Sequence, residues 1–355
     1  MQHYRAPLWM AGSGALGGHV QTIWPALFSH AHDPVQARGA ASDRGAKVPY
    51  TRQRWDTPDG DFIDVDALLP PGWQPGTSPL LVLLHGLEGS SQSHYARAFA
   101  LWAQEQGWAY VVPHFRGCSG EPNRAPRFYH SGDYEEIGWM LQRVVAQWGG
   151  PVSVVGVSLG GNALLRWAQE AGAAATQVAS AVAAVCSPLD LTAAGHAIGA
   201  GFNRVTYNRM FMQTLKPKAL AKLKHYPGLF DEQALRAAQD LYAYDAIVTA
   251  PLHGFASTED YWTRCSSRPG LKHLKDVPAL VLNALNDPFV PAWSLPGLQD
   301  VGPAVTLWQP PQGGHVGFPA GRPPGHVAAL PQAVATWLAQ HARPADLSKI
   351  EKRHG

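Results

Sequence analysis

The sequence has few cysteines and few charged residues, and both shortages narrow the class of protein it encodes. Its 355 residues include three cysteines, Cys118, Cys186 and Cys265. An odd number in so long a chain argues against a disulfide framework and fits a reducing compartment. Charged residues make up 15% of the chain and the formal net charge is +2, so the composition predicts no general attraction to nucleic acid.

Long apolar segments are missing as well. No stretch approaches the roughly 18 consecutive apolar residues of a membrane span. The N-terminal segment MQHYRAPLWMAGSGALGG has one early arginine and a weakly apolar centre interrupted by glycines, so we expect no signal peptide. These absences predict a cytoplasmic protein without a transmembrane segment. They leave open peripheral contact with a membrane, and they leave the oligomeric state unknown.

The chain is rich in apolar residues, glycine and proline. Hydrophobic residues make up 46% of the sequence and aromatic residues 10%, which excludes intrinsic disorder. Its 36 glycines and 30 prolines exceed average usage without reaching the low-complexity range. The composition therefore predicts a globular protein with many tight loops.

Short apolar runs alternate with helical patterns along much of the chain. Helical spacing of apolar residues predicts helices over about 94–106 and 133–148, and another from about 162. Uninterrupted apolar runs predict strands covered on both faces, at residues 80–84, 108–112, 152–157, 178–186 and 279–285. The alternation predicts an α/β fold, with a mostly parallel, doubly wound sheet.

Three regions depart from that alternation. Residues 1–47 show no sustained period and are predicted to wrap the surface. Runs at 49–55 and 62–69 alternate and predict a half-exposed antiparallel hairpin, in which Asp64 and Asp66 face away from the apolar side. Between Pro188 and Pro278 the pattern breaks into helical pieces rich in Tyr, Phe, Met and Lys, which predict a helical cap over one edge of the sheet. The expected domains are a core of 48–190 and 276–345 and a cap of 191–275.

The most informative motif is Gly156-Val157-Ser158-Leu159-Gly160, directly between a predicted strand and a predicted helix. In a G-x-S-x-G turn the glycines allow a sharp bend that projects the serine hydroxyl out of the sheet. The plain alternative is a glycine-rich turn whose serine only caps the helix. The strand–turn–helix context favours Ser158 as a nucleophile.

A nucleophilic serine needs a histidine to take its proton and a carboxylate to orient that histidine. In this type of fold the chain order is Ser, acid, His. Asp287 follows the apolar run PALVLNAL, and His315 lies in the small-residue loop GGHVG; these are the predicted acid and base. A turn residue before Pro288 is the plain alternative for Asp287. The rival candidates are Asp190 as acid and His326 as base. His341 and Asp346 have an H-x4-D spacing similar to that of some acyltransferases, and we interpret so short a pattern as coincidental.

The tetrahedral intermediate of acyl transfer needs backbone N–H donors for its negatively charged oxygen. One donor is predicted from Leu159, immediately after the nucleophile. The other is predicted from Leu87, in the loop HGLEG that follows the first buried run.

Several stretches of the chain resemble the YheT-like branch of the α/β-hydrolase superfamily. They follow one another in order over nearly the whole sequence: HVQTIWP (19–25), HGLEGS (85–90), HFRGCSGEPNR (114–124), YHSGD (129–133), GVSLGGN (156–162), YDAIVTAPLHGFASTEDYW (244–262) and LNALNDPFVP (282–291). The resemblance implies an α/β-hydrolase fold, a Ser158–Asp287–His315 triad and a hydrolase of carboxylic esters. Relatives in this branch include lipases and esterases of acylglycerols, phospholipids or acyl ethyl esters. Many eukaryotic relatives carry an N-terminal membrane anchor, for which this sequence shows no candidate.

We therefore expect a serine carboxylesterase acting on short- to medium-chain acyl esters, with monoacylglycerols among the candidates. An acyltransferase or thioesterase with the same triad remains an alternative, and so does a non-catalytic binding protein on this scaffold. No metal-binding or phosphate-binding motif is present, so neither a metal nor an organic cofactor is expected.

Two groups of residues have two interpretations each. The cap side chains Phe202, Tyr207 and Phe211, with Met210 and Met212, either enclose an acyl chain or form the core of the cap. Arg116 and Arg124 either hold an anionic group of the substrate or pair with acidic residues of the helix near 133–148.

Overall fold

The structure, a computed structural model, describes residues 1–11, 16–33 and 48–342. The strands are β1 (Thr51–Asp56), β2 (Phe62–Leu68), β3 (Leu80–Leu84), β4 (Ala109–Pro113), β5 (Val152–Val157), β6 (Ala179–Val185), β7 (Ala279–Leu282) and β8 (Val305–Trp308). Together they form an 8-stranded sheet in the order β1-β2-β4-β3-β5-β6-β7-β8. β2 is antiparallel to both of its neighbours, and all other neighbours are parallel. The predicted antiparallel hairpin and parallel sheet are confirmed.

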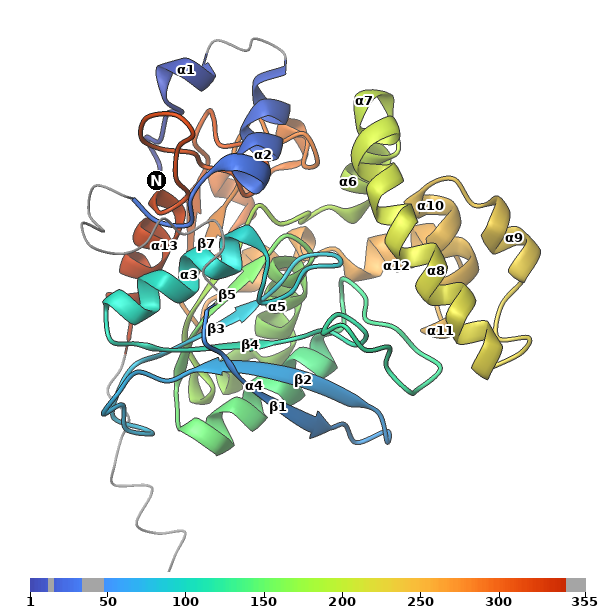
Figure 1. The fold of residues 1–355 in the computed structure, drawn as a ribbon, viewed down its shortest axis with the longest axis horizontal. Coiled ribbons are helices and arrows are strands. Elements are labelled where there is room, and N and C mark those ends of the chain that lie inside the picture. Colours follow the sequence, from blue (N-terminus) through green and yellow to red (C-terminus); the bar gives the residue numbers. More distant parts are fainter. Residues whose placement is uncertain (12–15, 34–47, 343–355) are drawn as a thin grey trace, which may run out of the picture.

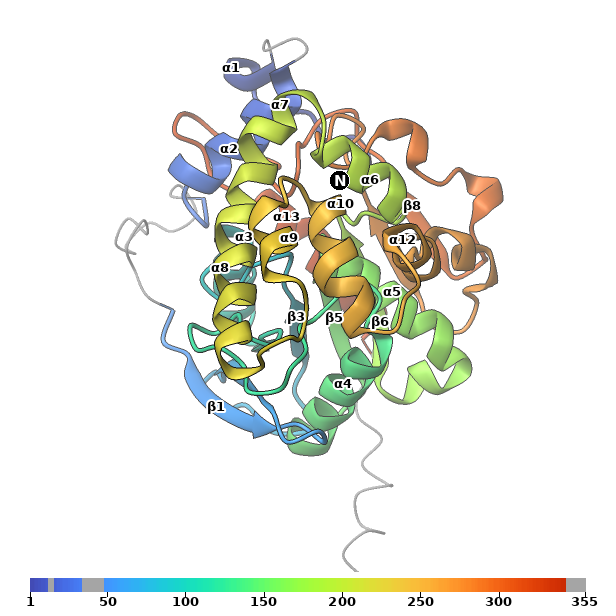
Figure 2. The same ribbon diagram turned by 90° about the vertical axis from the view of Figure 1, so that its right-hand side faces the viewer.

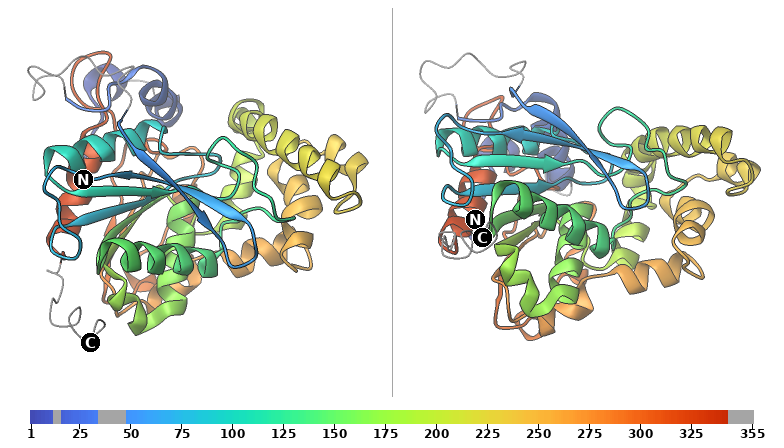
Figure 3. Two further views of the ribbon diagram at one scale, coloured as in Figure 1. Left: turned by 60° about the horizontal axis from the view of Figure 1, so that its bottom comes forward. Right: turned by 90° about the horizontal axis from the view of Figure 1, so that it is seen from below.

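Helices cover both faces of the sheet (Figure 1). On one face lie α3 (His94–Glu105) and α13 (Ala329–Ala339), which pack on strand residues such as Leu81 and Leu83. On the other lie α4 (Tyr134–Trp148) and α5 (Leu159–Ala171), which pack on the alternate residues Val82 and Leu84. Successive residues of one strand thus enter two different cores, which explains why these strands are wholly apolar. The views in Figure 3 show the sheet between its two helical layers.

The hairpin strand β2 is buried rather than half-exposed, so that part of the sequence prediction is wrong. Asp64 and Asp66 are 3% and 2% exposed, respectively. The register of β1 on β2 places Arg54 opposite Asp64 and Arg52 opposite Asp66, and each pair forms a salt bridge, at 2.8 and 2.7 Å. Alternation alone could not distinguish solvent from a neighbouring strand's arginines.

Strand β8 is a short edge strand that the sequence analysis did not predict. It pairs in parallel with β7 and is half-buried along its length. The predicted run at 279–285 ends earlier in the structure, at Leu282, and the chain then turns toward the predicted acid.

Helices occupy the interval predicted to be a cap, and Figure 2 shows them in front of the carboxyl ends of β3, β5 and β6. They pack through an apolar cluster that includes Leu215, Leu235 and Val248 of the cap and Phe289 and Val290 of the core. The main helices are α6 (Leu191–Ile198), α7 (Gly201–Asn203), α8 (Arg209–His225), α9 (Glu232–Ala237), α10 (Leu241–Tyr244), α11 (Ala250–Leu252) and α12 (Thr258–Cys265). The same interval contains two π-helical turns, η3 (Arg204–Asn208) and η4 (Asp245–Thr249), and the 3-10 turn η5 (Arg268–His273). The core contains the 3-10 turns η2 (Gly172–Gln177), η6 (Ala292–Ser294) and η7 (Leu298–Asp300).

The N-terminal segment contains two helices for which the sequence showed no period, α1 (Leu8–Ala11) and α2 (Gly17–Phe28). Gln21 and Thr22 of α2 are buried. This part of the segment therefore contributes to the core beside the loop that carries His315. Residues 34–47 of the segment lie outside the described part of the chain. In that described part, no helix is both long and apolar enough to cross a membrane.

Candidate active site

Ser158 lies at the sharp turn between β5 and α5. Its backbone has φ 53° and ψ −121°, and a positive φ is unfavourable for any residue other than glycine. The turn lies close against the end of β3, since a Cβ at Gly160 would lie 2.5 Å from the carbonyl oxygens of Leu84 and His85. The Ser158 N–H donates to Val185 O at 2.8 Å. The turn thus has the strained geometry expected of the G-x-S-x-G motif.

The structure brings Ser158, Asp287 and His315 together from three separate parts of the sequence. His315 Nε2 is 3.1 Å from Ser158 Oγ, and His315 Nδ1 is 2.8 Å from Asp287 Oδ2. The second carboxylate oxygen of Asp287 accepts from the N–H groups of Phe289 and Val290 at 2.8 and 3.3 Å. With Nδ1 donating to the carboxylate, Nε2 is free to accept the serine proton. The arrangement can remove the serine proton as Ser158 Oγ attacks an acyl carbon.

The rival acid and bases lie elsewhere. Asp190 is the N-cap of α6, where its side chain accepts from the N–H of Ala193. His326 lies 3.4 Å from Asp33, and His341 Nδ1 contacts Trp337 O at 2.9 Å. Asp346 lies outside the described residues.

The two predicted oxyanion donors flank Ser158. Leu159 is the first residue of α5, so its N–H has no acceptor within the helix. Leu87 follows Gly86, where a Cβ would lie 3.2 Å from Ser158 Cβ. The turn at Leu87 is fixed by its neighbours, because the Gly86 N–H donates to Tyr95 Oη at 2.9 Å and the Glu88 N–H to Tyr129 Oη at 2.8 Å.

His85, just before this turn, is a structural residue. Its Nδ1 contacts Gly86 O at 2.8 Å and its Nε2 accepts from the Phe115 N–H at 3.0 Å. Complete burial lowers the pKa of His85 to about 3, so the ring stays neutral and keeps both contacts at physiological pH.

Helix α2 holds the loop that carries His315. The His315 N–H donates to Thr22 Oγ1 at 2.8 Å, and the Gly313 N–H donates to Gln21 Oε1 at 2.8 Å. Between them, the Gly314 N–H donates to Asn286 Oδ1 at 3.0 Å, and the Asn286 amide donates to Gln21 Oε1 at 2.9 Å. Sequence reasoning missed these three polar residues. The sequence did contain one signal for them, because the polar pair Gln21-Thr22 interrupts the apolar residues of HVQTIWP, one of the stretches that resemble the family.

Two cavities meet at Ser158, and Leu87, Phe211 and Phe289 also line both. The inner cavity, about 120 Å³, lies between the sheet edge and the cap, with walls that include Leu191, Ala194, Ile198, Leu215, Tyr244 and Trp262. The outer cavity, about 380 Å³, lies between α2 and the start of α8, with walls that include Ile23, Ala26, Leu27, Tyr207, Met210 and His315.

The three predicted substrate-binding aromatics have different positions relative to these cavities. Phe211 lines both, Tyr207 lines the outer one only, and Phe202 lines neither. Phe202 is 47% exposed and packs edge-on against His19, with ring centroids 4.7 Å apart. Phe211 and Tyr207 also belong to the apolar cluster of the cap, so the two interpretations of these residues overlap.

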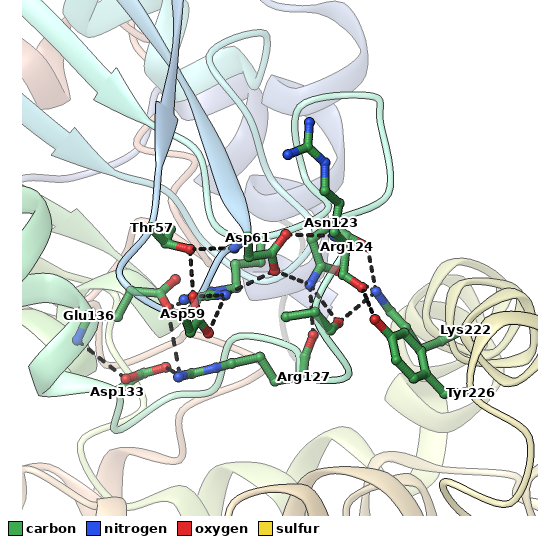
Figure 4. A network of polar contacts seen from close by, with 12 residues as sticks. Thr57, Asp59, Asp61, Asn123, Arg124, Arg127, Asp133, Glu136, Lys222 and Tyr226 are labelled. Carbon is green, nitrogen blue, oxygen red and sulfur yellow. Dashed lines mark hydrogen bonds and ion pairs between the residues drawn. The ribbon is translucent and has the colours of Figure 1, made fainter.

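Arg124 takes part in a polar network that joins the hairpin, the 114–133 loop and the cap (Figure 4). Arg116 belongs to the same network through its bonds to Glu136 and Asp61. Arg116 is 4% exposed and pairs with Glu136 at 2.7 Å and with Asp61 at 2.9 Å. The Arg124 N–H donates to Asp61 Oδ1 at 2.6 Å, and its guanidinium lies over the ring of Phe62. These contacts favour the structural interpretation of Arg116, which also borders the inner cavity. The contacts of Arg124 are with Asp61 and Phe62 of the hairpin rather than with the predicted helix.

Among the described residues, one group of side chains has metal-ligand spacing, namely Cys186, Asp287 and His315, whose ligand atoms lie within 4.8 Å of one another. The carboxylate and the imidazole already bond to each other. Burial raises the pKa of the Cys186 thiol well above its usual range, so this sulfur stays protonated and is a poor ligand.

Comparison with known proteins gives a consistent result. The family model described as "alpha/beta hydrolase fold" matches residues 79–321. The protein of Escherichia coli (strain K12) named "Putative esterase YheT" is 37% identical over 306 residues, covering 85% of this chain and 84% of its own. "Phospholipase ABHD3" of Mus musculus is 29% identical over 284 residues, covering 76% and 67%.

Solved structures show likeness of fold. The alpha/beta hydrolase GrgF from Penicillium sp. sh18 covers 83% of this chain and 99% of its own, with a TM-score of 0.54 at 14% identity. "The structure of DcsB complex with its substrate analogue" covers 82% of this chain and 99% of its own, with a TM-score of 0.53 at 13% identity.

Proposed function

The chain belongs to the YheT-like branch of the α/β-hydrolase superfamily and is a hydrolase, and we propose that it cleaves carboxylic esters of short- to medium-chain acids. Ser158 is the proposed nucleophile, His315 the base and acid, and Asp287 the residue that orients and stabilises the imidazolium. Leu87 and Leu159 are the proposed oxyanion donors. The observation that carries the proposal is the continuous contact from Ser158 Oγ through His315 to Asp287, at 3.1 and 2.8 Å.

The reaction proceeds in two halves. Ser158 Oγ bonds to the acyl carbon while its proton moves to His315 Nε2. The bond from carbon to the alcohol oxygen then breaks as Nε2 gives that proton to the leaving oxygen. In the second half, water gives a proton to Nε2 and its oxygen to the acyl carbon, and Ser158 recovers its proton as the acid leaves. The negative oxygen of each tetrahedral intermediate accepts from the backbone N–H groups of Leu87 and Leu159.

The test of the nucleophile is covalent labelling with a fluorophosphonate. The parent protein should be labelled at Ser158, and Ser158→Ala should lose both the label and ester hydrolysis while its circular dichroism stays unchanged. Ser153→Ala, on the strand of the same turn, is a control that should keep the label. A label on a different serine would refute the assignment. Repeating the hydrolysis assay with an added alcohol or thiol measures any acyl transfer, because both acceptors would compete with water for the same acyl-enzyme.

A further inference from the structure

The two cavities at Ser158 differ in how far they are enclosed. The inner cavity is lined by buried residues of the cap, among them Leu191, Ala194 and Leu215, which are 7%, 2% and 7% exposed. The outer cavity has Leu27 and Met210 in its wall, which are 65% and 52% exposed. The first therefore lies deeper under the cap, whereas the second is the more open to solvent, between α2 and α8.

Only one of the two cavities is bordered by the candidate acid–base residue. His315 lines the outer cavity and is absent from the wall of the inner one. Its Nε2 lies 3.1 Å from Ser158 Oγ and must also reach the oxygen of the leaving alcohol to protonate it. The alcohol part of an ester must therefore lie on the His315 side of Ser158.

The remaining substituents of the tetrahedral carbon have their places set in turn. One bond goes to Ser158 Oγ, and the negative oxygen faces the N–H groups of Leu87 and Leu159. Since the alcohol oxygen points toward His315, the fourth substituent, the acyl chain, must point away from the histidine. That direction leads into the inner cavity, which Leu159 lines and His315 does not.

Building on the proposed function, we propose that the inner cavity binds the acyl chain, and that the outer cavity admits the alcohol part and then the water. This assignment moves the acyl site away from the predicted aromatics Phe202 and Tyr207. It places the site instead among residues of α6, α8 and α10, with Ala194 and Ile198 of α6 in its wall.

The two carboxylates in the wall of the inner cavity have partners within the protein. Asp245 accepts from Thr249 Oγ1 at 2.6 Å and from Trp262 Nε1 at 2.9 Å. Glu88 accepts from Tyr129 Oη at 2.9 Å and pairs with Lys218 at 2.7 Å. Groups that already have partners gain little from a polar substituent on the ligand. The favoured acyl groups are accordingly unsubstituted alkanoyl chains, each added methylene raising kcat/KM up to about fourfold until the inner cavity is full.

Two matched substitutions separate the cavities, each adding a phenyl ring to an alanine on a helix. Ala194→Phe fills the inner cavity and Ala26→Phe narrows the outer one. Both are assayed on two series, p-nitrophenyl esters from acetate to palmitate and butyrates of alcohols of increasing size. Ala194→Phe should move the acyl optimum to shorter chains, with at least a tenfold loss on the parent's best ester, and should keep the order of preference among alcohols. Ala26→Phe should lower kcat/KM selectively for bulky alcohols and keep the acyl optimum.

The enlarging variant Ile198→Ala covers the case in which Ala194→Phe does not fold, and it should move the acyl optimum to longer chains. Labelling by a small fluorophosphonate reports an intact serine in every variant. The assignment is overturned if the parent hydrolyses esters and the two phenylalanine variants show the reverse pattern, or if Ile198→Ala leaves the acyl profile unchanged. If the parent takes neither the label nor any ester, the proposed function itself fails, which is a different result.

Discussion

At the edge of the sheet that carries the proposed triad, the N–H groups of Gly313, Gly314 and His315 each donate to a side-chain oxygen. The cap residues above Ser158, by contrast, line the inner cavity mainly with apolar side chains. Hydrogen bonds have a direction, so the first region fixes the position of the imidazole. Apolar contact has none, so the cap can line a cavity with several sets of side chains. We therefore expect the reaction rate to depend on the hydrogen bonds around His315, and the substrate preference to depend on apolar contacts in the cap. The two properties should respond differently to mutation.

Polar contacts add to the apolar packing that attaches the cap to the core. Lys222 of α8 is 5% exposed, and its Nζ donates to Asn123 Oδ1 at 3.1 Å and to Ala125 O at 2.9 Å. Tyr226, one helical turn further on, donates to Arg124 O at 2.9 Å. Figure 4 shows both side chains reaching from α8 to the 114–133 loop. Since that loop also forms a wall of the inner cavity, these contacts tie the shape of the cavity to the core.

The largest effect is expected at the catalytic edge. Asp287→Asn preserves the shape of the side chain but favours the wrong tautomer of His315, so kcat should fall by about 10⁴-fold. Asp190→Asn, the same change at the rival acid, should change kcat by less than about threefold, because asparagine also caps helices well. Both are measured by initial rates on a p-nitrophenyl ester. If Asp190→Asn were the more damaging of the two, the proposed triad would be wrong.

A smaller loss is expected where α2 positions the histidine. Thr22→Val keeps the shape of the side chain but leaves the His315 N–H without its acceptor. The loop should shift, and kcat should fall roughly ten- to hundredfold with little change in KM. Thr22→Ser keeps the hydroxyl and should restore most of the rate. An equal loss in both variants would show that packing of the threonine methyl, rather than the hydrogen bond, matters.

In the cap, a substitution should change preference more than rate. Phe211 lines both cavities and packs against Phe289, with ring centroids 6.1 Å apart. Phe211→Ala should move the acyl optimum to longer chains, lower the maximal kcat/KM by only a few-fold and cost roughly 3 kcal/mol of stability. Phe202→Ala is the matched control outside the cavities and should leave the acyl profile unchanged. If the parent hydrolysed all esters from acetate to palmitate at the same rate, neither Phe211 nor Phe202 could be part of an acyl-binding pocket.

The last expected effect is on stability rather than on activity, and it comes from the titration of Asp245 in the cap. Burial raises the pKa of Asp245 from 3.8 to about 6, against the hydrogen bonds from Thr249 and Trp262. The folded protein thus holds this proton more tightly than the unfolded chain does. The contribution to stability is present below about pH 4, is lost as the pH rises to about 6, and stays absent above.

Asp245→Asn removes this titration. The free energy of unfolding of the variant, relative to the parent, should therefore rise by roughly 2–3 kcal/mol between pH 4 and pH 7. Urea unfolding at a series of pH values measures it. A difference that does not change over this range would mean that Asp245 titrates normally.

The buried strands and the loop that carries the proposed nucleophile could be predicted from the sequence, because each is marked by a pattern of neighbouring residues. A wholly apolar run of five or six residues marks a strand with two covered faces, and the glycines around Ser158 mark a turn that only they permit. The order Ser, acid, His along the chain then predicted which aspartate and histidine the structure brings to that turn.

The tertiary structure alone decided what touches these elements. No periodicity in the first residues indicated that Gln21 and Thr22 would hold a loop almost 300 positions away, at a sequence separation of 292 for Gln21 and Gly313. Nor could alternation reveal that Asp64 and Asp66 face arginines rather than water. The two cavities depend on how the cap packs over the sheet. Apolar composition does not specify this packing, because it determines how much surface is buried but not which residues contact one another.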